Sequence, residues 1–165
     1  MSKLEKLVEK GYVLHGSKSK FDIAKPNKKA RVPEGGGQLN AIYTTDIPLI
    51  SMFKSITRPQ KTPAKKGVAG WRIFKNRNVR FRLTPNYLKY DGFGDGYVYA
   101  FKKEDFVKDK KIPHEFYSKE RQRPKYTFLV KPEDFLKFAK ITKWKKDEVR
   151  KAGFHTEEEI QKMFM

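Results

Sequence analysis

The chain of 165 residues contains no cysteine. Disulfide bonds and thiolate metal sites are therefore excluded, and an extracellular fold stapled by disulfides is not expected. No apolar run approaches the roughly 18 residues that a membrane-spanning helix needs. Residues 1–10 are charged throughout and lack the apolar segment of a signal peptide. We expect a cytoplasmic protein that does not enter a membrane and acts as a monomer.

Acidic residues are scarce. There are 19 Asp and Glu against 38 Lys and Arg, which gives a formal net charge of +19 and a sequence pI of ≈ 10.0. Such a field attracts polyanions, so nucleic acid or another polyanion is the expected partner. A lysine-rich proteome bias, or selection for solubility, would give the same charge, so the charge alone does not indicate a function. The 38% of hydrophobic residues are enough to build one core.

Several common functional motifs are missing. The glycines of residues 91–96 precede no Gly-Lys-Ser/Thr sequence and do not lead from a strand into a helix, so they form a turn rather than a phosphate-binding loop. His114 and His155 have no partners at ligand spacing, and we expect no metal site. A serine-hydrolase elbow is also absent.

The apolar pattern predicts strands in the middle of the chain and helices at both ends. Ser2 and Glu5 have capping-box spacing, so a helix begins at residue 3, and Gly11 ends it. Strands are expected at 12–14, 38–45, 71–74, 79–83, 97–101, 114–118 and 126–130. Further helices are expected at 47–56, where Leu49, Ile50 and Phe53 would be buried, at 132–140, at 145–152 and after Thr156.

These elements predict an α+β fold with a curved, mainly antiparallel sheet. We expect a single domain over residues 1–165, with a core at about 10–131 and a C-terminal helical extension at 132–165. In the strand at 79–83, Arg80 and Arg82 alternate with apolar residues, so one face should be apolar and the other cationic.

Three polar residues stand at the ends of predicted strands: His15, Tyr43 and Glu120. Taken singly, each has an ordinary explanation. A histidine after a strand is usually a turn residue, a strand tyrosine is usually core, and Glu120 has Lys119 and Arg121 beside it as ion-pair partners.

Their order and context, however, resemble the His-Tyr-Glu signature of the ADP-ribosyltransferase fold, in its diphtheria-toxin and poly(ADP-ribose) polymerase branch. The resemblance implies a split β-sheet and NAD bound as a substrate. It implies that His15-Gly16-Ser17 contacts NAD, with the histidine on a ribose hydroxyl and the glycine backbone on the nicotinamide carboxamide. A glycine suits that role because a planar ligand can approach its backbone closely.

Tyr43 would stack on the nicotinamide, and Ser51, eight residues later, would bond its carboxamide. Glu120, or alternatively Glu115, would stabilise the positive charge that develops on the ribose. The branch has a second stacking tyrosine, near whose position this chain has Phe53 and Lys54. The resemblance therefore implies a diverged member.

Two functions follow. The first is an NAD-dependent ADP-ribosyltransferase that cleaves the nicotinamide–ribose bond and passes ADP-ribose to an acceptor, with nucleic acid favoured by the charge. The second is a non-catalytic basic protein that binds nucleic acid. Trp144 is either a stacking residue in such an interface or a buried anchor of its helix. The candidate nucleic-acid contacts are Lys61, Lys65, Lys66, Arg80, Arg82, Lys145 and Lys146.

Overall fold

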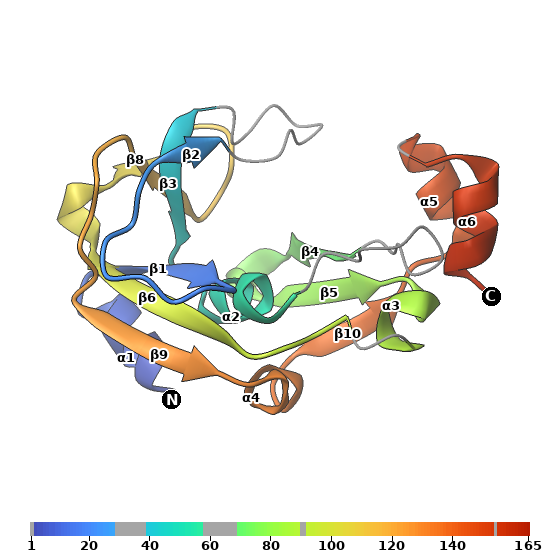
Figure 1. The fold of residues 1–165 in the computed structure, drawn as a ribbon, viewed down its shortest axis with the longest axis horizontal. Helices are drawn as coiled ribbons and strands as arrows, with labels where there is room; N and C mark the ends of the chain where they lie inside the picture. The colour runs from blue at the N-terminus through green and yellow to red at the C-terminus, as the bar shows by residue number, and fades with distance from the viewer. Residues whose placement is uncertain (1, 29–38, 58–68, 90–91, 154) are drawn as a thin grey trace. The chain divides into compact units, whose positions relative to one another are not determined.

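The computed structural model describes residues 2–28, 39–57, 69–89, 92–153 and 155–165. The chain divides into two compact units, and each unit is built from two separate stretches of sequence. Unit 1 comprises Met1–Ile56 and Asp95–Lys131, and unit 2 comprises Thr57–Gly94 and Pro132–Met165. The secondary structure is α+β with mainly antiparallel sheets, as the sequence predicts (Figure 1).

Helix α1 (Lys3–Glu9) begins with the expected capping box. The Glu5 amide donates to Ser2 Oγ at 3.2 Å, and the Ser2 amide donates to Glu5 Oε2 at 2.6 Å. Gly11 follows at φ +86°, a left-handed conformation that costs a glycine little. The first predicted helix is therefore confirmed, together with both of its end signals.

Unit 1 contains a seven-stranded sheet with the order β7-β8-β3-β1-β6-β9, and β2 pairs with β3. All of its pairings are antiparallel. The strands predicted in this unit are confirmed, and β2, β7 and the short 3₁₀ helix η3 (Lys103–Asp105) are additional. The strands are β1 (Tyr12–Ser17), β2 (Asn27–Lys28), β3 (Asn40–Thr45), β6 (Gly96–Lys102), β7 (Val107–Lys108), β8 (Glu115–Ser118) and β9 (Tyr126–Val130).

One face of this sheet carries a cluster of buried hydrophobic side chains. Because side chains alternate along a strand, Val13 and His15 share a face, and Val13 belongs to this cluster. Phe21 packs against the cluster and stacks on the Tyr99 ring with centroids 3.8 Å apart. The buried members are Val13, Ala24, Ile42, Tyr99, Phe101, Phe106 and Phe116.

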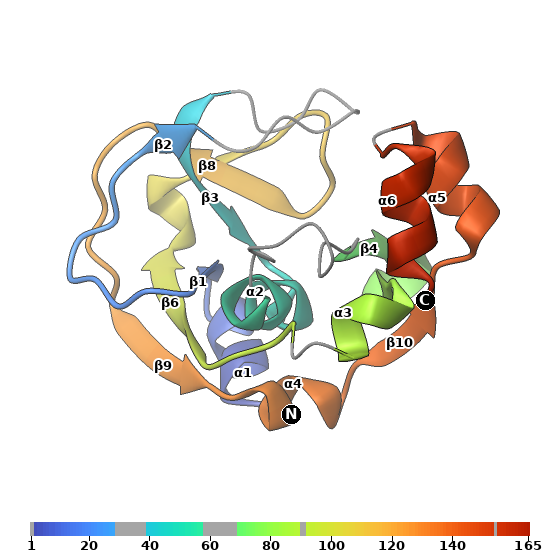
Figure 2. The ribbon, with the colours of Figure 1, turned by 45° about the vertical axis from the view of Figure 1, so that its right-hand side comes forward.

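Helix α2 (Pro48–Ile56) packs on the other face, against β1 and β6 (Figure 2). Two glycines make this approach possible. A Cβ on Gly16 would lie 2.0 Å from the Ser51 carbonyl oxygen, and one on Gly96 would lie 2.1 Å from the Ser55 carbonyl oxygen. The backbones of helix and sheet are therefore in direct contact. Ile50 and Phe53 are buried as predicted, whereas Leu49 is half-buried.

Unit 2 contains a three-stranded sheet with the order β10-β5-β4. The predicted hairpin is confirmed: β4 and β5 pair antiparallel around the 3₁₀ helix η2 (Lys75–Arg77). The alternation on β5 is also confirmed, because Val79, Phe81 and Leu83 are buried and Arg80 is exposed. Its elements are β4 (Ala69–Ile73), β5 (Val79–Leu83), α3 (Pro85–Lys89), α4 (Pro132–Leu136), β10 (Lys140–Lys143), α5 (Lys146–Ala152) and α6 (Glu157–Met163).

The predicted helix at 132–140 is wrong in its second half. Helix α4 ends at Leu136, and the chain then forms β10, which pairs parallel to β5. Lys140 and Thr142 alternate with Ile141, and this short pattern suits an edge strand that gains backbone hydrogen bonds from β5. Helix α3 was not expected, although Thr84 followed by Pro85 is a typical helix start.

In the described part of the chain, every helix is too short or too polar to cross a membrane.

The contact of α2 with the two glycines predicts a sharp cost for added methyl groups. Gly16→Ala and Gly96→Ala should each destabilise unit 1 by about 1–3 kcal/mol, because helix backbone must move away. Gly70→Ala is the control, since its Cβ would lie 3.9 Å from the Trp144 ring, an ordinary contact.

Urea unfolding followed by far-UV circular dichroism measures the effect. Tryptophan fluorescence is unsuitable for unit 1 because both tryptophans, Trp71 and Trp144, belong to unit 2. Unchanged unfolding of Gly16→Ala would contradict the close packing of α2.

Candidate functional site

The sheet of unit 1 is split between β1 and β3. Strand β1 pairs with β6 at six positions and β3 pairs with β8 at four, but β1 and β3 share the single register pair Leu14–Thr45. Beyond that pair β3 leaves β1 at a steep angle (Figures 1 and 2). We call residues 15–17 of β1 and residues 40–43 of β3 the strand split.

His15 bridges this split. Its Nδ1 lies 2.7 Å from the Tyr43 carbonyl oxygen. A carbonyl can only accept, so Nδ1 carries the hydrogen and, in the neutral ring, Nε2 holds the free lone pair. The ring is further positioned by Phe21, with ring centroids 6.0 Å apart. Phe21 is itself fixed, because its amide donates to the Tyr99 hydroxyl at 2.8 Å.

The surroundings favour the neutral form of His15. Burial lowers the pKa of His15 from its usual 6.5, the bond to the Tyr43 carbonyl opposes this, and the charge of Lys54 lowers it further. Nε2 is therefore a hydrogen-bond acceptor at neutral pH, and a sugar hydroxyl is a suitable donor to it.

The other residues that the resemblance implies as NAD contacts are less accessible to a ligand. The space beside Gly16 that a side chain would fill is occupied by the α2 backbone, so the missing Cβ serves helix packing. Ser51 has no exposed surface, and its hydroxyl donates to the Pro48 carbonyl at 2.7 Å. Ser17, at the end of β1, is half-buried, and its Oγ accepts from the Ser19 amide at 3.2 Å.

Tyr43 is only 7% exposed, and alternation places its ring on the face of the sheet opposite His15. The Leu39 amide donates to its hydroxyl at 2.9 Å, and the hydroxyl donates to the Leu39 carbonyl at 3.1 Å. Burial raises the pKa of Tyr43, and the charge of Glu115 adds to that rise. It is thus the backbone of Tyr43, not its ring, that meets His15.

The two candidate carboxylates, Glu115 and Glu120, are associated with different faces of the unit 1 sheet. Glu115 is buried at the start of β8, where it pairs with Thr45 and shares the face of Tyr43. Glu120 is exposed in the segment after β8, and its amide donates to Ser118 Oγ at 3.2 Å.

That segment is tied to the face of His15. The Gln122 side-chain amide donates to Ser118 Oγ at 3.0 Å, and Gln122 and Ala24 exchange backbone hydrogen bonds of 2.8 and 3.1 Å. Ala24 and Ile42, the register partner of Ser118, both belong to the core on that face. The fold therefore groups His15 with the Glu120 segment, and Tyr43 with Glu115.

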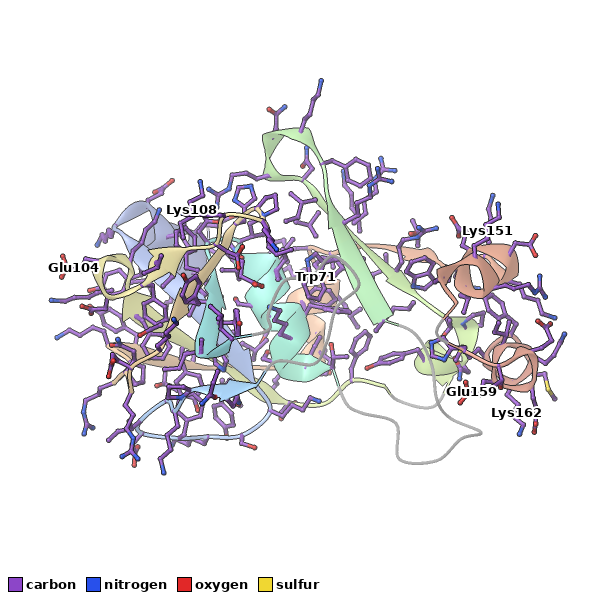
Figure 3. All side chains as sticks on the ribbon, turned by 90° about the horizontal axis from the view of Figure 1, so that it is seen from above. Trp71, Glu104, Lys108, Lys151, Glu159 and Lys162 are labelled. Atoms are coloured by element: carbon purple, nitrogen blue, oxygen red, sulfur yellow. The ribbon has the colours of Figure 1, made fainter. Side chains whose placement is uncertain are left out.

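A hollow of about 840 Å³ lies elsewhere in unit 1, where β1 begins and β6 ends. His15, Tyr43, Ser51 and Glu120 do not line it. At its wall the His114 Nδ1 lies 2.9 Å from Asp46 Oδ1. Glu104 and Lys108, which also line the hollow, are labelled in Figure 3. The charged residues of the hollow are Lys10, Asp46, Lys102, Lys103, Glu104 and Lys108. Within the described residues, no group of three His, Asp or Glu side chains is placed to hold a metal ion.

The candidate nucleic-acid contacts separate into different environments. Arg80 is exposed, whereas Arg82 forms an ion pair with Glu148 at 2.5 Å and lies over the Trp144 ring at 4.1 Å. Lys145 is exposed, and the Lys146 ammonium donates to Gln161. Lys61, Lys65 and Lys66 lie outside the described residues.

Trp144 anchors helices α5 and α6 and is not a free stacking surface. Its indole Nε1 donates to the Arg82 carbonyl at 3.1 Å, and the ring packs on Val149, Ile160 and Met163. Sequence reasoning missed Arg72 and Lys140, which lie on the same sheet as Arg80, and Phe74, which directly follows β4. The alternation around Arg72 and Phe74 was visible in the sequence, but the assignment of 132–140 to a helix hid the position of Lys140.

Comparison of the chain with protein-family models, with curated proteins and with solved structures found no match.

The depressed pKa of His15 predicts a pH dependence of stability. Between the folded pKa and 6.5 the unfolded chain binds more protons at this residue than the folded chain does. The free energy of unfolding should therefore rise with pH through this window, be fully recovered above about pH 6.5, and fall as the pH drops through the folded pKa.

Urea midpoints of the wild type and His15→Asn between about pH 5 and pH 8 test this assignment. The difference in unfolding free energy between the two proteins should be constant above the window and shrink below it. A difference that is the same at every pH would remove His15 as the titrating group.

Proposed function

We propose that unit 1 binds NAD at the strand split and transfers ADP-ribose from it to an acceptor. The observation that supports this best is the bond from His15 Nδ1 to the Tyr43 carbonyl at 2.7 Å. The bond fixes the tautomer and orients the ring, and in the neutral form it leaves the Nε2 lone pair to accept. A ribose hydroxyl of NAD donates to that nitrogen.

The fit of the remaining residues is partial. Ser17 and Glu120 lie at surfaces that a ligand can reach, whereas Ser51 is buried and its hydroxyl already donates. We therefore assign the ribose contact to His15 and no contact to Ser51. Tyr43 contributes the carbonyl that holds His15, and its buried ring supports β3.

Glu120 supplies the charge for the reaction. When the nicotinamide–ribose bond breaks, nicotinamide leaves with the bonding electron pair and the ribose carbon becomes positive. A carboxylate aimed at that carbon lowers the energy of the transition state. The acceptor then forms a bond to the same carbon through a lone pair and loses its proton to water. Glu120 is preferred to Glu115 because its segment is tied to the face of His15.

NAD binding is tested by thermal stability. At roughly 100 times its Kd, NAD should stabilise the wild type by about 2.7 kcal/mol. His15→Asn is the informative variant, because its amide nitrogen can replace Nδ1 as the donor to the Tyr43 carbonyl but offers no acceptor in place of Nε2. It should fold and lose the shift.

His15→Gln is the matched control, because its amide reaches the position of Nε2. It should retain part of the shift. If neither NAD nor nicotinamide at millimolar concentration raises the melting temperature of the wild type, the proposed substrate is wrong.

The chemical role is tested by nicotinamide release. Glu120→Gln should keep NAD binding and lower turnover by about 10²-fold or more, because the lost interaction strengthens only in the transition state. Glu115→Gln is the companion variant, and its activity should stay within a few-fold of the wild type. The reverse pattern would transfer the role to Glu115.

A further inference from the structure

Three cations form a row across the sheet of unit 2. In the register of the sheet, Arg80 on β5 stands opposite Arg72 on β4 and opposite Lys140 on β10. Residues opposite each other project to the same face, with Cβ atoms about 5 Å apart. Arg72, Arg80 and Lys140 are all exposed. We call these three residues the cation row.

Within the described parts of the chain, the row has no acidic partners. Residues 69–83 contain five Arg and Lys and no Asp or Glu. Among the described residues, no carboxylate forms an ion pair with any member of the row, whereas neighbouring Arg82 is paired with Glu148. Like charges directly opposite each other destabilise a sheet. The row therefore costs stability, and an anionic ligand would relieve that cost.

An exposed aromatic ring lies within the same surface. Phe74 is 40% exposed, and the guanidiniums of Arg72 and Arg80 lie 5.3 and 5.0 Å from its centroid. The Phe74 amide donates to the Asn78 carbonyl at 2.7 Å, which closes the hairpin and holds the backbone at Phe74. Figure 3 shows this hairpin, identified by the label on Trp71 of β4.

We propose that the cation row and Phe74 bind single-stranded nucleic acid. The phosphates neutralise Arg72, Arg80 and Lys140, and an unpaired base stacks on Phe74 and the flanking guanidinium planes. Such a combination of backbone charge and a flat apolar ring is the usual means of holding single strands without reading their sequence. A duplex has its bases already stacked and gains only the charge contacts.

This binding belongs to unit 2 and does not depend on NAD. Fluorescence anisotropy of a labelled single-stranded oligonucleotide measures it, with the full chain and several salt concentrations. The test variant is Arg72→Gln, Arg80→Gln and Lys140→Gln together. The control variant is Lys137→Gln, Lys143→Gln and Lys151→Gln, which removes the same charge from other positions of unit 2.

The test variant should reduce the slope of log K against log salt by about 2, since each single-strand phosphate contact contributes about 0.7. The control should keep most of the slope. The test variant should also melt at a higher temperature than the wild type, because the repulsion within the row is gone. Misfolding cannot explain a loss of affinity for the oligonucleotide in a variant whose melting temperature has risen.

Phe74→Ala should weaken single-strand binding about tenfold or more and leave the salt slope unchanged. Three results would overturn the proposal: no binding of the wild type near 50 mM salt, an equal loss in the control and test variants, or equal affinity for duplex and single strand with no effect of Phe74→Ala. The last would point to a general polyanion surface.

Discussion

The contact between α2 and the glycines of β1 and β6 is the constraint on which the rest of unit 1 depends. With Gly16 and Gly96 the helix backbone reaches the sheet backbone, and Ser51 and Ser55 provide the carbonyls that touch it. A helix held this closely fixes β1 beside β6 over its full length, as their six register pairs show. Strand β3, which runs directly into α2, then meets β1 at one position only.

This geometry explains why a polar side chain sits at the split. Where two strands part, their facing backbone groups lose the partners that a continuous sheet would give them. The His15 ring supplies one such partner to Tyr43 from the side chain instead of the main chain. The price of that arrangement is a partly desolvated imidazole with a lowered pKa. A residue that stabilises the split is thereby left with one free acceptor atom.

Much of the fold followed from local signals in the sequence. A few neighbouring residues are enough to predict three of its features. These are the capping box of α1, the turn at Gly11 and the alternation of Val79, Phe81 and Leu83. Such features are encoded locally because their energies are local. The α+β class and the antiparallel pairing followed from them.

The arrangement of the candidate site did not follow in the same way. Tyr43 and Glu115 share a face only because Thr45 pairs with Glu115, a register set by residues distant in sequence. The cation row likewise needs the parallel pairing of Lys140 with Arg80, and the residues after Pro132 have a helical pattern of their own. A resemblance based on the order of His15, Tyr43 and Glu120 cannot distinguish the two faces of a sheet.

The two units alternate along the chain, and this sets the sequence in which they can be completed. Every segment of unit 1 has been synthesised once the ribosome has passed Lys131. Unit 2 is still unfinished at that moment, because β5 lacks its parallel neighbour β10 and Trp144 has not been made. During this interval unit 1 can already fold, whereas the β5 edge of the β4–β5 hairpin has no strand paired to it. A cationic hairpin tolerates this interval, since its charge discourages association with another strand edge.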